Sequence, residues 1–205
     1  MKITNSFFNN RFILASSSLS RFKILKKNKL YFTKVAPLCN EDSLKKKLIS
    51  KKTPHKKISL ELARLKSKSV SKKIKDIIVL GSDTIISFQG RVLSKAKNLE
   101  EAKETILNFS GKTHTIYSSA SVFFNNKEIW SATQKSVIKM RRLTENDVKE
   151  YLRKAGNKIL SSVGCYQAES LGPNLIESIE GDFFNVQGLP FFPFLLFLNG
   201  YKKSK

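Results

Sequence analysis

The stretch "DIIVLGSDTIISFQGRVL", residues 76–93, joins two apolar segments through a glycine, a hydroxyl and a single carboxylate. Its apolar start predicts a buried strand, Gly81 predicts a turn, and the β-branched residues that follow predict a second strand ending at a tight turn at Gly90. Asp83 places one charge where both flanking segments favour burial. Because an unpaired buried carboxylate is costly, Asp83 requires a partner, either a Lys or Arg, a metal ion, or the backbone of a turn that it caps.

Strands and helices alternate on both sides of this stretch, which indicates a mixed α/β sheet with helices around it. Residues 12–15 and 30–35 predict strands, and residues 20–27 predict a helix capped by the preceding serines. Residues 58–70 predict an amphipathic helix. Its predicted buried face consists of Ile58, Leu62, Leu65 and Ser69. The polar, Lys-rich residues 40–57 predict a mobile loop or a frayed helix.

Caps and turns separate the predicted elements downstream. Asn98 and Glu101 form a capping box before a helix over residues 99–109, and Thr144 caps a helix that closes at Gly156. Two long β runs between these helices, joined by the polar "NNK", predict a hairpin. After a Gly-punctuated region with short strands comes the apolar tail "LPFFPFLLFLNG". It is too short to span a membrane and predicts a helix or turn packed on the core.

The formal net charge of +22 raises the question of a nucleic-acid partner, because clustered cations release counterions from a phosphate backbone. Arginine favours base-edge recognition and bidentate phosphate contacts, but only seven arginines are present. The remaining cations are lysines scattered along the chain. This pattern favours a solvated surface, and a dedicated nucleic-acid patch is the alternative.

The cysteines and histidines are too dispersed for a zinc site or a disulfide scaffold. Cys39 and Cys165 form no CxxC pair, and His55 and His114 are isolated. Unpaired cysteines fit a reducing cytosol, so we expect a cytoplasmic protein that does not bind a membrane. The apolar run near the N-terminus, within residues 1–18, is too short for a signal sequence.

Two further stretches invite a phosphate-binding interpretation. "FSGKT" at residues 109–113 fails as a P-loop, because Ile106 stands where that motif requires a glycine. It predicts a turn that ends a helix and leads into a strand. "LASSSLSR" at residues 14–21 places hydroxyls, backbone amides and Arg21 where a strand passes into a helix. That arrangement suits a bound anion and equally suits ordinary capping by serine.

The ordered series of motifs resembles the Maf family of nucleotide pyrophosphatases from about residue 12 to 198. The matching stretches are "ILASSS" with Arg21, "NE" at 40–41, "LARLKS" at 62–67, "GSDTII" at 81–86, "LSK" at 93–95, "SGKTH" at 110–114, "GCYQAE" and "IEGDFFNVQGLP". The resemblance implies a single domain over residues 1–205. The implied fold is an elongated, two-lobed α/β mixed-sheet fold, related to inosine triphosphate pyrophosphatases, with a central cleft between the lobes.

The resemblance also implies an activity. Maf proteins hydrolyse nucleoside triphosphates to the monophosphate and pyrophosphate with a divalent cation, and they often dimerise. A house-cleaning role and arrest of cell division are further implied roles. The alternative from another class is a non-catalytic regulator that binds nucleotides or nucleic acid through the basic surface.

Seven residues receive roles from the resemblance. Asp83 matches the catalytic aspartate, and Asp83 and Glu41 would hold the cation, Mg²⁺ or Mn²⁺. The implied substrate-binding residues are Ser16, Arg21, Lys66, Lys95 and Glu169. The positively charged side chains among them, Arg21, Lys66 and Lys95, would bind the triphosphate and offset the charge on the leaving pyrophosphate while a water attacks the α phosphorus. Whether Asp83 takes the proton, holds the metal or does both stays open.

Several positions depart from the usual family pattern. Phe22 stands where a second arginine is usual, Asn40 replaces an aspartate, and Ala96 replaces a proline. Glu169 replaces a glutamine, and together with an extra residue before Arg21 it is similar to the branch associated with 7-methyl-GTP. The candidate substrates are therefore 7-methyl-GTP and the pyrimidine nucleotides dTTP and UTP.

Overall fold

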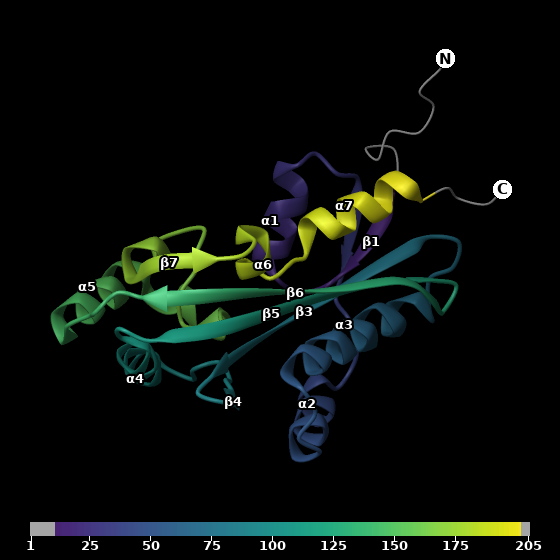
Figure 1. Ribbon diagram of the computed structural model, residues 1–205. Coiled ribbons are helices and arrows are strands. Elements are labelled where there is room, and N and C mark those ends of the chain that lie inside the picture. Colours follow the sequence, from purple (N-terminus) through teal and green to yellow (C-terminus); the bar gives the residue numbers. More distant parts are fainter. Residues whose placement is uncertain (1–10, 202–205) are drawn as a thin grey trace. The chain divides into compact units, whose positions relative to one another are not determined.

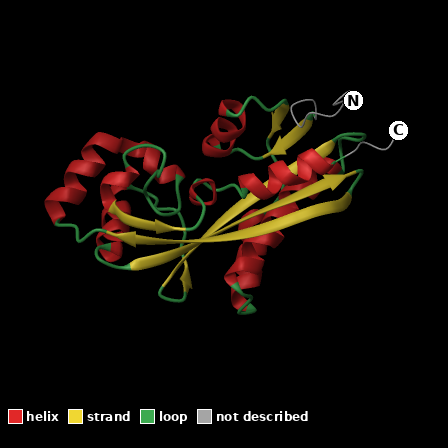
Figure 2. Ribbon diagram, turned by 45° about the horizontal axis from the view of Figure 1, so that its top comes forward, coloured by secondary structure: helices red, strands yellow, loops and turns green. Residues whose placement is uncertain are grey.

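The protein is described by a computed structural model that covers residues 11–201 (Figure 1). The strands are β1 (Phe12–Ala15), β2 (Phe32–Val35), β3 (Ile78–Phe88), β4 (Arg91–Val92), β5 (Thr113–Phe124), β6 (Lys127–Met140) and β7 (Ile176–Glu180). The helices are α1 (Leu19–Lys27), α2 (Glu41–Ser50), α3 (His55–Ser71), α4 (Leu99–Phe109), α5 (Glu145–Ala155), α6 (Phe183–Val186) and α7 (Phe191–Gly200). This content confirms the predicted mixed α/β class (Figure 2). The expectation that the N-terminus carries no signal sequence falls partly on residues 1–10, outside the described range.

Within the described range the strands form a seven-stranded mixed sheet in the order β2-β1-β3-β5-β6-β7, with β4 paired to β3. β1 runs parallel to β2 and β3, whereas β4 and β7 are antiparallel to their neighbours. Contacts divide the chain into two compact units. The first comprises Met1–Thr84, Ser118–Gln134 and Gly188–Lys205, and the second comprises Ile85–Tyr117 and Lys135–Gln187. The predicted cleft between two lobes stays a prediction.

In the first unit, β1 and β3 send alternate side chains to the two faces of the sheet. Ile13 and Val79 face α3, where they form a cluster with Val70. On the opposite face, Phe12 packs edge-on against Phe194 of α7, with ring centroids 5.2 Å apart. Figures 1 and 2 show α3 on one side of these strands and α7 on the other. The apolar tail is therefore a helix packed on the core, as predicted.

None of the helices in residues 11–201 is both long enough and apolar enough to cross a membrane.

Gly81 lies inside β3, and the turn predicted at this position is wrong. The strand continues through it without a break. A Cβ atom at Gly81 would lie only 2.4 Å from the carbonyl oxygen of Ala63 and 2.6 Å from the amide nitrogen of Ser67. Glycine is therefore present because α3 packs its backbone directly on the strand. The contact fixes α3 beside Asp83, which follows two residues later on the same face.

Residues 40–57 are largely helical, so of the two predicted alternatives the mobile loop is wrong and the helix is confirmed for most of the stretch. They form α2 and the start of α3. Asn40 caps α2, because its Oδ1 accepts a hydrogen bond from the amide of Ser43 at 2.9 Å. Glu41 and Asp42 in the first turn interact favourably with the helix dipole. Asn40 thus supplies the cap that an aspartate would supply.

The amphipathic character of α3 is confirmed, but its predicted face is partly wrong. Ile58 and Leu62 are buried as expected, whereas Leu65 and Ser69 are only half-buried. The buried residues instead recur about every four positions along the helix, and Lys66 is one of them. The prediction from hydrophobic periodicity left Lys66 off the buried face, because a charged residue is seldom buried without a partner.

The second unit has its own core, formed by α4, α5 and those parts of β3, β5 and β6 that belong to this unit. Its fully buried members include Ile106, Phe109, Ile116, Ile138 and Val148. The predicted N-caps are confirmed, since Asn98 accepts from the amide of Glu101 and Thr144 accepts from the amide of Asp147. The capping box predicted for Asn98 and Glu101 is only half formed, because the Glu101 carboxylate accepts from the amide of Lys97 and not from that of Asn98.

The predicted hairpin between β5 and β6 is confirmed. It closes through Asn125 and Asn126, whose φ angles of 47° and 65° suit a two-residue turn.

Candidate active site

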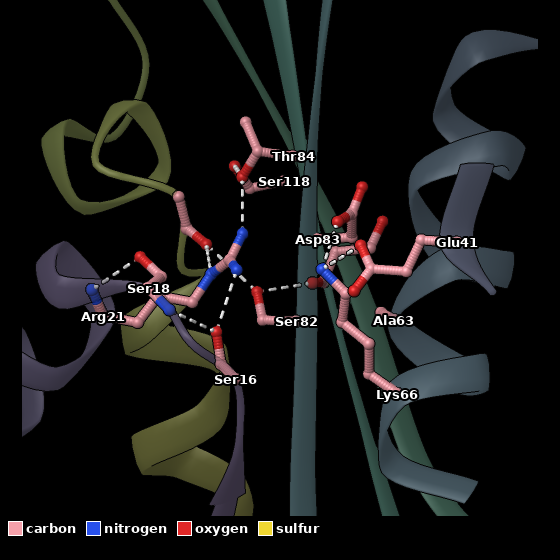
Figure 3. Close-up of polar contacts among 12 residues, drawn as sticks. Ser16, Ser18, Arg21, Glu41, Ala63, Lys66, Ser82, Asp83, Thr84 and Ser118 are labelled. Atoms are coloured by element: carbon pink, nitrogen blue, oxygen red, sulfur yellow. Dashed lines mark hydrogen bonds and ion pairs between the residues drawn. The ribbon is translucent and has the colours of Figure 1, made fainter. Parts of the chain in front are cut away.

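The site is built on β3, where the neighbouring strand β1 ends. β1 pairs with β3 as far as Ala15 opposite Gly81, so residues 82–84 extend beyond the end of β1. Asp83 faces α3, and the residues on either side of it face the opposite way (Figure 3). Ser16 begins the loop that leaves β1. Open α/β sheets bind ligands at the carboxyl ends of parallel strands, which is the location of these side chains.

On the α3 side, Lys66 bridges two carboxylates. Its Nζ lies 2.6 Å from Oδ1 of Asp83 and 2.9 Å from Oε2 of Glu41 (Figure 3). The side chains of Lys66 and Asp83 are only 8% and 12% exposed, whereas that of Glu41 is 40% exposed. We call these three residues the Lys66 cluster. Asp83 therefore has the cationic partner that its burial requires.

On the other side of β3, Arg21 is buried and each of its guanidinium nitrogens has a protein partner. Nε donates to the carbonyl of Gly188 at 2.7 Å, Nη1 donates to Oγ of Ser16 at 3.2 Å, and Nη2 donates to Oγ1 of Thr84 at 3.0 Å. Burial lowers the pKa of Arg21, and the negative charges of Asp83 and Glu41 offset part of that effect. Arg21 is thus a fixed positive charge close to the Lys66 cluster.

Two members of this arrangement were missed as functional residues in the sequence. Thr84 and Gly188 hold the guanidinium of Arg21 but received no predicted role. Both lie in stretches that match the family, "GSDTII" and "IEGDFFNVQGLP", so their position in these motifs was the available signal. Gly188 acts through its backbone carbonyl, and a side-chain pattern cannot reveal such a contact.

The loop between β1 and α1 confirms capping by serine. Oγ of Ser18 accepts from the amide of Arg21 at 3.4 Å, and Oγ of Ser16 accepts from the amide of Ser18 at 3.2 Å. Phe22, at the position of the usual second arginine, packs on Phe32 with ring centroids 5.5 Å apart. Anion binding by this loop stays a prediction.

Lys95 and Glu169 belong to the second unit. Lys95 lies between β4 and α4, and Glu169 lies shortly before the 3₁₀ turn at Gly172–Leu175. Both side chains are exposed. Their roles as substrate-binding residues stay predictions from the family resemblance.

Glu41 and Asp83 supply the carboxylate oxygens that Mg²⁺ and Mn²⁺ prefer. No group of three or more His, Cys, Asp or Glu side chains between residues 11 and 201 could hold a metal ion. Two carboxylates fit a divalent cation that takes its other ligands from phosphate and water, as Mg²⁺ usually does. The ammonium of Lys66 lies between these same two carboxylates, which shows that the position suits a cation.

Cys39 lies beside the Lys66 cluster but is not a candidate nucleophile. Burial and the negative charge of Glu41 raise the pKa of its thiol, so the reactive thiolate is disfavoured. Cys39 and Cys165 are both free thiols, which agrees with the absence of a disulfide scaffold. An open hollow of about 570 Å³ is lined by Cys39, Asn40, Asp42 and one member of the cluster, Glu41.

Known proteins resemble this chain over nearly its whole length. The family described as "Maf-like protein" matches residues 11–201. A nucleoside triphosphate pyrophosphatase from Pelagibacter ubique is 38% identical over 178 residues, 87% of this chain and 91% of that protein. A 7-methyl-GTP pyrophosphatase from Bartonella henselae is 37% identical over 190 residues, 93% of this chain and 95% of that protein.

Among solved structures, a HAM1 protein from Coxiella burnetii matches 65% of this chain and 74% of its own at 14% identity. Its TM-score of 0.44 is too low to support an argument about fold or function. The family match spans the motifs on both sides of β3, and the two relatives share more than a third of their residues with this chain over most of its length. The chain is therefore a member of the Maf family.

Proposed function

We propose that this Maf protein is an enzyme that hydrolyses nucleoside triphosphates between the α and β phosphates, releasing a monophosphate and pyrophosphate. The names of its relatives support this class of reaction. The observation that carries the proposal is the Lys66 cluster, in which a buried lysine and two carboxylates converge beside a strand end. A protein that only binds nucleotides has no need for two carboxylates at a site for anions.

The residues divide the work by charge. Arg21, Lys66 and Lys95 would offset the roughly four negative charges of a triphosphate and the charge that develops on the leaving pyrophosphate. Glu41 and Asp83 would hold Mg²⁺ or Mn²⁺, which when bound lowers the pKa of a water ligand and polarises the phosphate. Asp83 is the proposed acceptor of the proton released by the attacking water.

Hydrolysis of a nucleotide panel with added Mg²⁺ or Mn²⁺, with the products identified, tests the proposal. The variant Asp83→Asn should lose roughly 10²- to 10⁴-fold in kcat, because it removes both the proton acceptor and a charge. Asp76→Asn is the matched control. Asp76 is exposed, and its φ of 59° suits asparagine, so that variant should keep full activity. If no nucleotide yields pyrophosphate, the proposal is wrong.

For the substrate we propose a purine nucleotide of the 7-methyl-GTP type. Support comes from Glu169, whose carboxylate can accept hydrogen bonds from a purine N–H or amino group, and from the Bartonella henselae relative. The Pelagibacter ubique relative has the broader name, so 7-methyl-GTP, dTTP and UTP must be compared directly. Glu169→Gln should reduce the preference for 7-methyl-GTP, and a clear preference of the wild type for pyrimidines would overturn the purine proposal.

The cellular roles are separate proposals. Removal of non-standard nucleotides would follow from hydrolysis, and arrest of cell division would be tested by overproducing the wild type and Asp83→Asn in parallel. Homodimer formation is likewise proposed from the family resemblance, and light scattering of the purified protein tests it.

A further inference from the structure

The Lys66 cluster and Arg21 form a group whose formal charges cancel. Glu41 and Asp83 are anionic, and Lys66 and Arg21 are cationic. Lys66 bonds to both carboxylates, while Arg21 bonds to uncharged atoms and influences the carboxylates from a distance. The pair that would hold a metal ion is therefore already neutralised by the protein.

A free divalent cation would meet an unfavourable field in this group. Between the carboxylates it would lie against the ammonium of Lys66, and the local formal charge would rise from zero to about +2 in a partly buried place. A metal ion that arrives with a triphosphate brings about four negative charges with it, and the total becomes negative. The ammonium can then exchange a carboxylate oxygen for a phosphate oxygen without losing an anionic partner.

Of the two carboxylates that contact Lys66, only one is placed so that it can separate from the ammonium. Asp83 and Lys66 are held together because Gly81 packs directly on α3. Glu41 is different, because it is the first residue of α2, a helix with no buried residue, and its side chain is 40% exposed. Glu41 is therefore the partner that can leave Lys66 at least cost.

We infer that the ammonium of Lys66 is a built-in counter-ion that keeps a free divalent cation from the Glu41–Asp83 pair until a nucleotide arrives. The metal ion then enters as a metal–nucleotide complex and not before it. This inference rests on the proposed function, since it takes a nucleoside triphosphate as the ligand.

Titration of the nucleotide-free protein with Mn²⁺, with free Mn²⁺ measured by electron paramagnetic resonance, tests the inference without turnover. Lys66→Met keeps the length of the side chain and removes its charge, so Mn²⁺ should bind at least about tenfold more tightly than to the wild type. Lys68→Met is the matched control, because Lys68 is an exposed lysine on the same helix, and it should match the wild type. Adding Glu41→Gln to Lys66→Met should remove the gained affinity.

A second measurement needs no substitution and covers the case in which Lys66→Met does not fold. Wild-type protein should hold Mn²⁺ during ultrafiltration when an α,β-methylene nucleotide is present and should not hold it when the nucleotide is absent. Tight Mn²⁺ binding to the nucleotide-free wild type, or an unchanged Mn²⁺ affinity in folded Lys66→Met, would overturn the inference. A nucleotide panel without hydrolysis would instead overturn the proposed function, so the two failures are distinguishable.

Discussion

Gly81 and Asp83 lie two residues apart on the same face of β3, and the first determines what the second can contact. The missing side chain of Gly81 lets α3 approach until Lys66 reaches Asp83. A larger residue would push the helix away and separate the ion pair. A small packing defect at this position therefore becomes an electrostatic defect in the site.

Gly81→Ala should therefore lower both stability and activity. Its Cβ would meet backbone atoms of α3 at 2.4 and 2.6 Å, and overpacking of this kind costs about 1–3 kcal/mol in unfolding free energy or more. Chemical denaturation and pyrophosphate release measure the two effects. Gly200→Ala is the control, because a Cβ there meets nothing within 4 Å. Normal activity in Gly81→Ala would show that α3 tolerates a shift.

His114 should make stability depend on pH. It is buried in the second unit, stacks on Phe109 with ring centroids 4.3 Å apart, and its Nε2 lies 2.6 Å from the hydroxyl of Tyr166. Its Nδ1 has no hydrogen-bond partner in the described part of the chain. Burial lowers the pKa of His114 from 6.5 to about 4. The native state therefore holds the imidazole neutral, whereas the unfolded state protonates it below pH 6.5.

The contribution of the buried, neutral His114 to the free energy of unfolding is therefore fully present above pH 6.5 and is lost as the pH falls towards 4. The total is about 3 kcal/mol, from the difference between the two pKa values. Urea denaturation of the wild type and His114→Gln across this range checks the sign. The difference between the two proteins isolates His114 from the carboxylates that also titrate, and parallel pH curves would contradict the prediction.

The need of Asp83 for a partner could be predicted from the sequence, because a lone charge between apolar runs has few alternatives. The identity of the partner could not be predicted from periodicity. Lys66 is 17 residues away and entered only through the family resemblance, and the turn wrongly expected at Gly81 concealed the helix contact. The partners of Arg21 are equally non-local, since Gly188 is separated from it by 167 positions.

At the scale of elements, α2 links local helix stability to the site. The helix has no buried residue, so its cap and its first turn carry much of its stability, and Glu41 is in that turn. Asn40→Ala removes the bond to the amide of Ser43 and should cost about 1 kcal/mol locally. We expect faster hydrogen exchange in α2 and a higher KM for the nucleotide, with little change in the global melting temperature.

Thr144→Ala is the matched control for this cap. It removes the cap of α5, whose buried residues include Val148 and Tyr151, and it should lower the melting temperature without changing KM. An unchanged KM in Asn40→Ala would show that the local stability of α2 does not affect substrate binding.

The success of element prediction depended on how local the signals were. Caps and turns at Asn98, Thr144 and Gly90 act within a few residues, and each was predicted correctly. α2 was misjudged because its lysines hide the apolar pattern, although its Asn40 cap and acidic first turn were visible. The face of α3 was misjudged because its register follows a buried ion pair and not apolar residues alone.

For the whole molecule, the charge of +22 should steer an anionic substrate towards the site. Exposed lysines gather after the first turn of α2 and at the start of α3: Lys46, Lys47, Lys51, Lys52, Lys56 and Lys57. Changing Lys46, Lys47, Lys51 and Lys52 to glutamine should lower kcat/KM several-fold at low salt and leave kcat unchanged. The difference should vanish at high salt, and a salt-independent kcat/KM in the wild type would contradict steering.

The same variant tests the alternative function. A regulator that binds nucleic acid through the lysines should show tight, strongly salt-dependent binding to DNA or RNA that survives Asp83→Asn and is lost in the glutamine variant. If the wild type, Asp83→Asn and the glutamine variant all bind DNA or RNA weakly and to a similar extent, the lysines form a solvated surface and not a nucleic-acid site.

The first unit is assembled from three separate segments of the chain, and this has a consequence for synthesis. Arg21 is translated early, but the carbonyl that holds it belongs to Gly188, and the helix that covers Phe12 follows only at Phe191–Gly200. Until this third segment leaves the ribosome, Arg21 lacks the carbonyl of Gly188 and Phe12 lacks its covering helix. The site therefore cannot be complete in a nascent chain, and we expect hydrolysis to begin only after residues 188–200 have been synthesised.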